Sequence, residues 1–237
     1  MRSLKLLIAI PAYNEETVIK YVLDAIPDNF RIMGEDCRVD VLAVNDGSSD
    51  KTAEKVIESK RKVSLVNHIL NMGAGGATLT ALEYAKINNY DFMTTMDADG
   101  QHKIQDVFST LNKCVEGGYD LVVGNRLATK GQMSNLKRLG NIGISILTKI
   151  ILGTSVKDSQ SGLRAYSKKA IQSLRFESLG YIFCSEMLMR AKNIGLKIGE
   201  NNIEAVYTDY SKSKGQSSWN GLEFVRKMLV LRIMEII

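Results

Sequence analysis

The first half of the chain alternates short apolar runs with segments of helical spacing, and this alternation limits the fold more than any other feature. Residues 4–10 (LKLLIAI) form a nearly continuous apolar run, as in a strand that is covered on both faces. Similar runs lie at VDVLAV, VSLVNH, DFMTTM and YDLVVGNR, and helical patterns separate them. We therefore predict an α/β domain with a mostly parallel central sheet and helices on both of its faces.

The second half is less regular and ends in an apolar segment with basic residues. Residues 134–153 predict one or two helical segments, and residues 181–195 predict a further helix. A polar loop precedes a terminal helix over residues 222–237. We expect a main domain over residues 1–216 and a C-terminal amphipathic helical appendage over residues 217–237.

The composition narrows the classes of partner. The formal net charge of +5 comes from 31 Lys and Arg against 26 Asp and Glu. This mild excess is below the dense positive field of a nucleic-acid-binding protein, so we expect no nucleic-acid partner, whereas an anionic substrate or membrane surface would suit it. The 3 cysteines are far apart without a CxxC pair, which favours a reducing compartment. We expect neither a signal peptide nor a membrane-spanning helix, which needs ~20 apolar residues.

Polar residues follow the predicted strands at the points where the strands end. In open α/β sheets, ligands bind beyond the carboxyl ends of the strands. We expect the residues at those ends to converge on one edge of the sheet. They are Tyr13, Asn14, Glu15, Asp46, Asn71, Gly73, Asp97, Asp99, Asn125 and Arg126.

Two of these residues, Asp97 and Asp99, are separated by a single residue in DADGQH. In an extended segment such residues point the same way, so the two carboxylates would face one point. Both stay ionised only if a cation offsets their charge, and the cation suited to oxygen ligands is Mg²⁺ or Mn²⁺. A solvated Asp-rich turn is the alternative, and for this motif alone it is the commoner outcome.

The motif is accompanied by IPAYNEE, VNDGSSDKT, NMGAGGA, GNR and SGLRAYS in a fixed order. Over residues 4–210 this set resembles the family 2 glycosyltransferases, which have the GT-A fold, and in particular the dolichol-phosphate mannosyltransferase and polyprenyl-phosphate glycosyltransferase group. Where those relatives carry an RxxGxSK-like loop, this chain has YTDYSKSKGQSSWN, which looks more like bacterial surface-polysaccharide glycosyltransferases. This departure puts mannose as the sugar and dolichol as the lipid in doubt.

The resemblance implies a nucleotide-sugar site. Asp46 would accept a hydrogen bond from a uracil N–H or a ribose hydroxyl, although an Asx turn with Gly47 is an alternative. The glycines at 75 and 76 could instead serve tight helix packing. The residues that the resemblance places beside the nucleotide are Pro11, Tyr13, Glu15, Asp46, Asn71 and Gly73.

The resemblance also implies a metal and diphosphate site at Asp97, Asp99 and Gln101. Metal-bound diphosphate is a better leaving group, because the cation offsets charge that develops as the glycosidic bond breaks. Arg126 would lie near the phosphates, where its planar fork suits bidentate contact; the alternative is a surface arginine. His102 could be a ligand, but a capping or surface role is the commoner one.

An acid within the helical pattern of residues 181–195, Glu186, completes the expected catalytic set with Asp99 and Arg126. It would take the proton of a hydroxyl acceptor, whereas a phosphate acceptor needs no base. The alternative is that Glu186 satisfies backbone groups or Arg164. We expect Asp158 to pair with Arg164 in a structural role.

The resemblance therefore implies an inverting, metal-dependent transfer of a sugar from a UDP- or GDP-sugar to a polyprenyl or dolichyl phosphate or a lipid-linked glycan. Two alternatives from other classes are a non-catalytic nucleotide-sugar-binding domain and a metal-dependent nucleotidyltransferase. The second alternative expects a Gly-rich basic loop after the first strand, but IPAYNEE is acidic there.

Two segments suggest contact with a membrane surface. Lys137 and Arg138 precede an Ile- and Leu-rich run, and Arg226, Lys227 and Arg232 lie within the last one. Basic apolar helices lie at anionic membrane surfaces, although both could be amphipathic core helices. We expect a peripheral protein on the cytoplasmic face of a membrane, and the resemblance implies that Arg138 meets the acceptor phosphate.

Overall fold

The computed structural model describes residues 4–128, 135–154, 156–204, 206 and 221–234. The strands of this part are β1 (Leu6–Ala12), β2 (Asn29–Ile32), β3 (Glu35–Asn45), β4 (Ser64–Asn67), β5 (Phe92–Thr95), β6 (Leu121–Asn125), β7 (Arg164–Ser167) and β8 (Ile198–Asn202). The helices are α1 (Ile19–Asp24), α2 (Thr52–Ile57), α3 (Gly73–Ile87), α4 (Ile104–Glu116), α5 (Asn135–Leu152), α6 (Lys168–Ser173), α7 (Phe183–Asn193) and α9 (Gly221–Met234).

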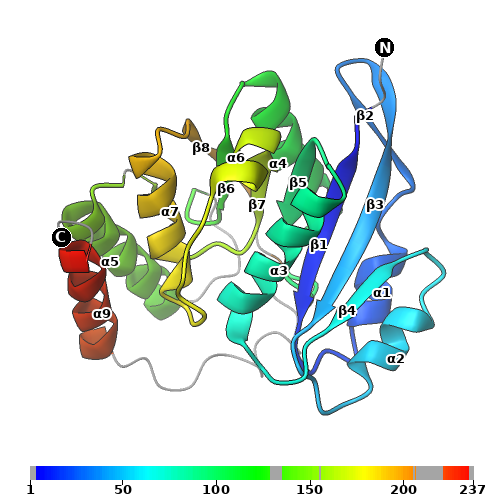
Figure 1. The fold of residues 1–237 in the computed structure, drawn as a ribbon, viewed down its shortest axis with the longest axis horizontal. Helices are drawn as coiled ribbons and strands as arrows, with labels where there is room; N and C mark the ends of the chain where they lie inside the picture. Colours follow the sequence, from blue (N-terminus) through cyan, green and yellow to red (C-terminus); the bar gives the residue numbers. More distant parts are fainter. Residues whose placement is uncertain (1–3, 129–134, 155, 205, 207–220, 235–237) are drawn as a thin grey trace.

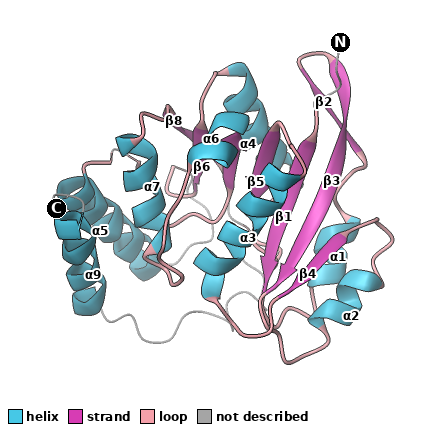
Figure 2. Ribbon diagram, in the orientation of Figure 1, coloured by secondary structure: helices cyan, strands magenta, loops and turns pink. Residues whose placement is uncertain are grey.

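The strands form a sheet in the order β2-β3-β1-β5-β7-β6-β8, and β4 pairs with the outer edge of β3 (Figure 2). Strand β1 lies parallel to β3 and β5, β3 lies parallel to β4, and β6 lies parallel to β8. Strands β2 and β7 run antiparallel to their neighbours. The prediction of a mostly parallel sheet is confirmed.

Both faces of the sheet are buried, which explains why β1 is a continuous apolar run. Leu6 and Ile8 pack with residues of α1, α2 and α4 in one core cluster. Leu7 and Ala9 point to the opposite face and pack with residues of α3, α6 and α7. Figure 1 shows α3, α6 and α7 in front of the sheet. The predicted helices on both faces are therefore present.

Helices α5 and α9 form a separate layer against α7 (Figure 1). The buried contacts of this layer come from Leu152, Ile182, Met189 and Met228. Residues 135–152 make one helix, where the sequence left one or two open. The predicted boundary after residue 216 lies outside the described residues, so the division into domain and appendage stays a prediction.

None of the helices in the described ranges is both long enough and apolar enough to cross a membrane.

Candidate active site

The loops after β1 and β3 are joined side by side at the carboxyl edge of the sheet. The Asp46 amide donates to the carbonyl of Ala12 at 2.8 Å. The amide of Asn14 donates to Ser48 Oγ at 2.9 Å, and that of Glu15 donates to Thr52 Oγ1 at 2.7 Å. Pro11 pairs with Val44 one residue before the end of β1, and Tyr13 is 47% exposed. The expected convergence of these two strand ends is confirmed.

Asp46 is buried, with 3% of the residue exposed. Its Oδ1 lies 2.7 Å from His68 Nδ1 and accepts a hydrogen bond from the Met72 amide at 2.9 Å. The following residue, Gly47, has φ +69°, and a Cβ there would lie 2.6 Å from the Asn71 nitrogen. The loop after β4 is thus packed over Asp46, which brings the predicted Asn71 and Asp46 together. His68 was missed from the sequence, because no motif singles it out.

Two backbone amides in the first turn of α3 donate hydrogen bonds to groups outside the helix. The Gly73 amide donates to Asn71 Oδ1 at 3.0 Å, and the Gly75 amide donates to the carbonyl of Leu179 at 2.8 Å. A Cβ at Gly75 would lie 2.7 Å from that carbonyl oxygen. The glycine therefore permits close packing of α3 on the 178–179 backbone, as the packing alternative expected.

The two carboxylates of the DADGQH motif make different contacts. Asp97 Oδ2 lies 3.0 Å from His102 Nε2, and the Asp97 side chain is 45% exposed. Asp99 accepts hydrogen bonds from the Gln101 amide at 2.9 Å and from Gln101 Nε2 at 2.6 Å. The His102 side chain is only 2% exposed, so the expectation of a capping or surface histidine is wrong. Its Nε2 contacts Asp97 instead.

A glycine of SGLRAYS, Gly162, lies against Asp97 just before strand β7. The Gly162 carbonyl accepts a hydrogen bond from Thr95 Oγ1 at 2.8 Å. A Cβ on Gly162 would lie 2.7 Å from the carboxyl carbon of Asp97, so a side chain at this position would have to displace that carboxylate. The Asp97 carboxylate therefore lies directly against the backbone at position 162.

Burial and nearby charges shift the pKa values of the two aspartates in opposite directions. Burial, and after it the charge of the neighbouring Asp97 carboxylate, raise the pKa of Asp99 to about 6. Burial opposes ionisation of Asp97 as well, but the His102 hydrogen bond and the charges of His102, Arg126 and Arg164 lower its pKa. A divalent cation would relieve the repulsion between these two neighbouring carboxylates.

The donor set fits Mg²⁺ or Mn²⁺. No cluster of three or more His, Cys, Asp or Glu side chains within the described ranges has the geometry of a metal site. Mg²⁺, however, usually binds through one or two carboxylates and completes its shell with water and substrate phosphates. Asp97 and Asp99 could supply those carboxylates, and the Asp97 side chain, 45% exposed, would leave room for the remaining ligands.

Arg126 lies at the end of β6 and is held by a buried carboxylate. Its Nε and Nη2 donate to Asp158 Oδ2 and Oδ1 at 2.8 and 2.9 Å, and its amide donates to Oδ2 at 3.1 Å. The expected pairing of Asp158 with Arg164 is therefore wrong. Arg164 is 1% exposed and donates instead to the carbonyls of Ser159 and Ser161.

Glu186 is fully buried and accepts hydrogen bonds from backbone amides. The Glu177 amide donates to Oε1 at 3.1 Å and the Ser178 amide donates to Oε2 at 2.8 Å. Arg190 Nε lies 3.4 Å from Oε1. Glu186 therefore has the backbone partners that the structural alternative expected. The arginine beside it is Arg190, where Arg164 was expected. A role of Glu186 as a base stays a prediction.

The predicted acceptor residue Arg138 lies in the first turns of α5. Its Nη2 donates to the carbonyl of Leu127 at 2.8 Å, one residue beyond Arg126. The segment that follows β6 therefore ties α5 to the site edge. The side chain of Lys137 lies outside the described residues.

Comparison with known proteins gives a consistent result. A model of the family described as Glycosyl transferase family 2 matches residues 7–175. An uncharacterised protein of Methanocaldococcus jannaschii is 35% identical over 234 residues, which cover 97% of this chain and 93% of that protein. The UDP-N-acetylglucosamine–dolichyl-phosphate N-acetylglucosaminyltransferase of Methanococcus voltae is 35% identical over 248 residues, 96% of each chain. The undecaprenyl-phosphate mannosyltransferase of Micrococcus luteus is 29% identical and covers 89% of this chain and 87% of that protein.

Solved structures include the glucosyl-3-phosphoglycerate synthase of Mycobacterium tuberculosis, in complex with Mn²⁺, UDP and glucosyl-3-phosphoglycerate. It has a TM-score of 0.68 at 19% identity, and the match covers 98% of this chain and 79% of that one. At this identity the likeness shows the fold alone, and it confirms the expected GT-A fold.

Proposed function

Because the chain belongs to glycosyl transferase family 2, and is therefore a glycosyltransferase, we propose that it transfers a sugar from a UDP- or GDP-sugar to a polyprenyl or dolichyl phosphate with inversion. The observation that carries the proposal is the pair of carboxylates, Asp97 and Asp99, on the same strand edge as the buried Asp46. Family membership argues against both alternatives, a nucleotidyltransferase and a non-catalytic binding domain.

The donor's nucleoside would lie over the ends of β1 and β3. Asp46 would accept a hydrogen bond from the base or ribose, and Tyr13, half-exposed beside it, would border the nucleoside. The other residues that we assign to this half of the site are Pro11, Glu15, Asn71 and Gly73.

The donor's diphosphate would lie over the ends of β5 and β6. Asp97, Asp99 and Gln101 would hold Mg²⁺ or Mn²⁺ there. When bound, the cation would offset the charge that develops on the leaving diphosphate. Arg126 would add a fixed positive charge, because Asp158 holds its guanidinium from the buried side.

A phosphate acceptor agrees with the contacts of Glu186. The M. voltae and M. luteus relatives are named for dolichyl phosphate and undecaprenyl phosphate. A phosphate oxygen is already anionic at neutral pH, so it can attack the anomeric carbon without a general base. The nucleoside diphosphate then leaves from the opposite side, and one displacement inverts the configuration. Glu186 would serve as a base only if the acceptor is a hydroxyl, as on a lipid-linked glycan.

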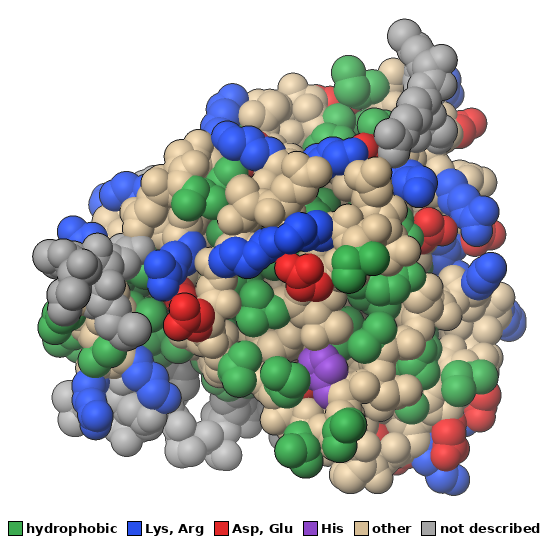
Figure 3. Space-filling model, viewed as in Figure 1, with side chains coloured by type: hydrophobic (Ala, Val, Ile, Leu, Met, Phe, Trp, Pro, Cys, Tyr) green, Lys and Arg blue, Asp and Glu red, His purple; other side chains and the backbone are tan. Residues whose placement is uncertain are grey.

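A lipid acceptor would bring the enzyme to the cytoplasmic face of a membrane as a peripheral protein. On the face in Figure 3, apolar and basic side chains lie beside one another at the left end, where Figure 1 places α5 and α9. Arg138 would meet the acceptor phosphate. The exposed apolar residues of these two helices are Leu139, Ile146, Ile150, Leu229, Val230 and Ile233.

Product stereochemistry tests the proposal. The chain is incubated with Mn²⁺, a short-chain polyprenyl phosphate and, in turn, α-linked UDP-glucose, UDP-N-acetylglucosamine and GDP-mannose. Proton NMR of the lipid product should show a β-linked sugar phosphate, with one free nucleoside diphosphate for each sugar transferred. An α-linked product would overturn inversion, and release of pyrophosphate would point to nucleotidyl transfer.

A further inference from the structure

A chain of three side chains links Asp46 to helix α3 behind the nucleoside half of the site. His68, which follows β4, lies with Nδ1 at 2.7 Å from Asp46 Oδ1 and with Nε2 at 2.8 Å from Thr80 Oγ1. The side chains of His68 and Asp46 are 9% and 4% exposed. The three groups come from three different elements, so their alignment is a property of the tertiary fold.

The neutral tautomer of His68 that suits both contacts assigns a donor to each hydrogen bond. A carboxylate is an acceptor only, so Nδ1 carries the proton that is donated to Asp46. In the neutral ring Nε2 is then an acceptor, and it receives the Thr80 hydroxyl proton. Because the Met72 amide also donates to Oδ1, one oxygen of Asp46 is committed to the protein. The other, Oδ2, takes no hydrogen bond from the described residues and is the oxygen for a ligand.

We propose that His68, oriented by Thr80, is a positioning residue that sets Asp46 to select the nucleobase of the donor. This inference rests on the proposed function. A fixed carboxylate accepts from a base whose pairing edge carries a ring N–H, as in uracil or guanine. It repels cytosine and adenine, whose ring nitrogen at that edge is itself an acceptor. His68 thus acts on affinity for the nucleoside and leaves the diphosphate half of the site unchanged.

The test is calorimetric titration of the full chain with UDP, GDP and CDP, each with Mn²⁺, and with Mn²⁺ and pyrophosphate as a probe that lacks a base. His68→Leu should weaken binding of UDP or GDP, whichever the unmodified chain prefers, by about tenfold or more, since a hydrogen bond to a charged group is lost. The preference of this variant for UDP or GDP over CDP should shrink, while its affinity for pyrophosphate stays within about twofold of that of the unmodified chain.

Three further variants separate positioning from general damage. His68→Asn places an amide N–H near the position of Nδ1 and should restore affinity to within about threefold. Thr80→Val keeps its shape but loses the hydroxyl, so it should weaken the preferred nucleotide about two- to fivefold. Tyr84→Phe removes another hydrogen bond between α3 and β4, from Tyr84 to Ser64, and should change nothing.

The results distinguish failure of the His68 inference from failure of the proposed function. If the unmodified chain binds and transfers while His68→Leu binds as tightly, the His68 inference fails alone. Equal weakening of nucleotide and pyrophosphate would also overturn it, because the effect would then be general. If no nucleotide binds the unmodified chain, both fail. Should His68→Leu not fold, unchanged affinity in Thr80→Val overturns the inference.

Discussion

The buried carboxylate of Asp158 holds the guanidinium of Arg126 through two side-chain hydrogen bonds of 2.8 and 2.9 Å. Asp158 is fully buried, whereas 14% of the Arg126 side chain reaches the surface of the site. Asp158 is therefore the inner support of a cation that faces the proposed diphosphate. The two residues lie 32 positions apart in the sequence.

Asp158→Asn replaces the carboxylate that orients Arg126 by a neutral amide, and so breaks a largely buried ion pair. Breaking such a pair costs about 3–5 kcal/mol of folding free energy. A misplaced guanidinium should also lower kcat/KM for the donor about 100-fold. Chemical denaturation and steady-state kinetics measure the two effects, and full activity in Asp158→Asn would remove Arg126 from the phosphate site.

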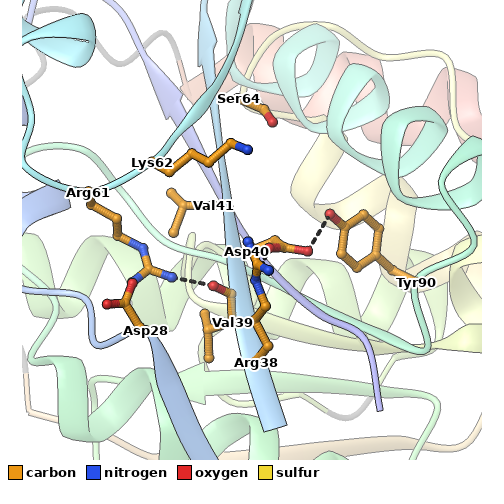
Figure 4. A pocket seen from close by; sticks show the side chains of 9 residues that line it. All are labelled: Asp28, Arg38, Val39, Asp40, Val41, Arg61, Lys62, Ser64 and Tyr90. Atoms are coloured by element: carbon orange, nitrogen blue, oxygen red, sulfur yellow. Dashed lines mark hydrogen bonds and ion pairs between the residues drawn. The ribbon is translucent and has the colours of Figure 1, made fainter. Parts of the chain in front are cut away.

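The Arg61–Asp28 pair offers a matched control near the amino end of β3 (Figure 4). The Asp28 side chain is 88% exposed, so water screens its charge. The Arg61 side chain is 6% exposed, but it also donates to the carbonyls of Ile26 and Val39, which remain as acceptors when the pair is lost. Asp28→Asn should change the free energy of unfolding by less than about 1 kcal/mol and leave kcat/KM within about twofold.

Gly162→Ala should displace the Asp97 carboxylate, because the added methyl would occupy its place. We expect Mn²⁺ affinity to fall at least about tenfold and turnover at least about 100-fold. Gly140→Ala, in α5, is the control: no described atom lies within 4 Å of the added methyl. It should stabilise the helix by about 0.5–1 kcal/mol and keep activity. Equal Mn²⁺ affinity in Gly162→Ala would contradict the account of Asp97.

Metal affinity of the ligand-free protein should depend on pH through Asp99. Its pKa of about 6 means that protons compete with Mn²⁺ below that value. The dissociation constant should rise about tenfold for each unit that pH falls below 6, and it should level off above about pH 7. Titration by electron paramagnetic resonance measures free Mn²⁺. Asp99→Asn should bind weakly and lose this pH dependence; a retained slope would assign the titration to another group.

The exposed apolar side chains of α5 should mediate contact with lipid. Ile150 is 73% exposed, so Ile150→Glu should place a charge on this surface without loss of folding. The fraction of protein that floats with anionic vesicles should then fall several-fold. Ile87→Glu is matched in exposure, at 78%, but lies on α3 and should float like the unmodified protein. If both variants float equally well, the membrane assignment of α5 is wrong.

Sequence patterns predicted the parallel part of the sheet because burial on both faces leaves continuous apolar runs. They also predicted that Asp46 and Asp97 lie at strand ends, since strand direction fixes the edge. The hairpin of β2 and β3 was missed. Its turn places Met33 and Gly34 at φ +51° and +84°, and a methionine at positive φ is not a recognised hairpin signal.

Partners across the tertiary structure could not be read from the sequence. Asp158 was expected to pair with Arg164, which is near in sequence, but β7 inserts antiparallel between β5 and β6 and brings Asp158 to Arg126. His68 follows a strand without any motif, and only the packing of the β4–α3 loop brings it to Asp46. Such pairings depend on strand order, which local patterns leave open.

Transfer of a labelled sugar onto a lipid phosphate tests the central claim most directly. The chain is incubated with a polyprenyl phosphate, Mn²⁺ and a panel of UDP- and GDP-sugars labelled with ¹⁴C in the sugar, and label is counted in the organic phase. We predict label in the lipid with at least one donor, equal to the nucleoside diphosphate released, and abolished by EDTA and by Asp99→Ala. Lipid labelling that persists in EDTA and in Asp99→Ala would contradict the account.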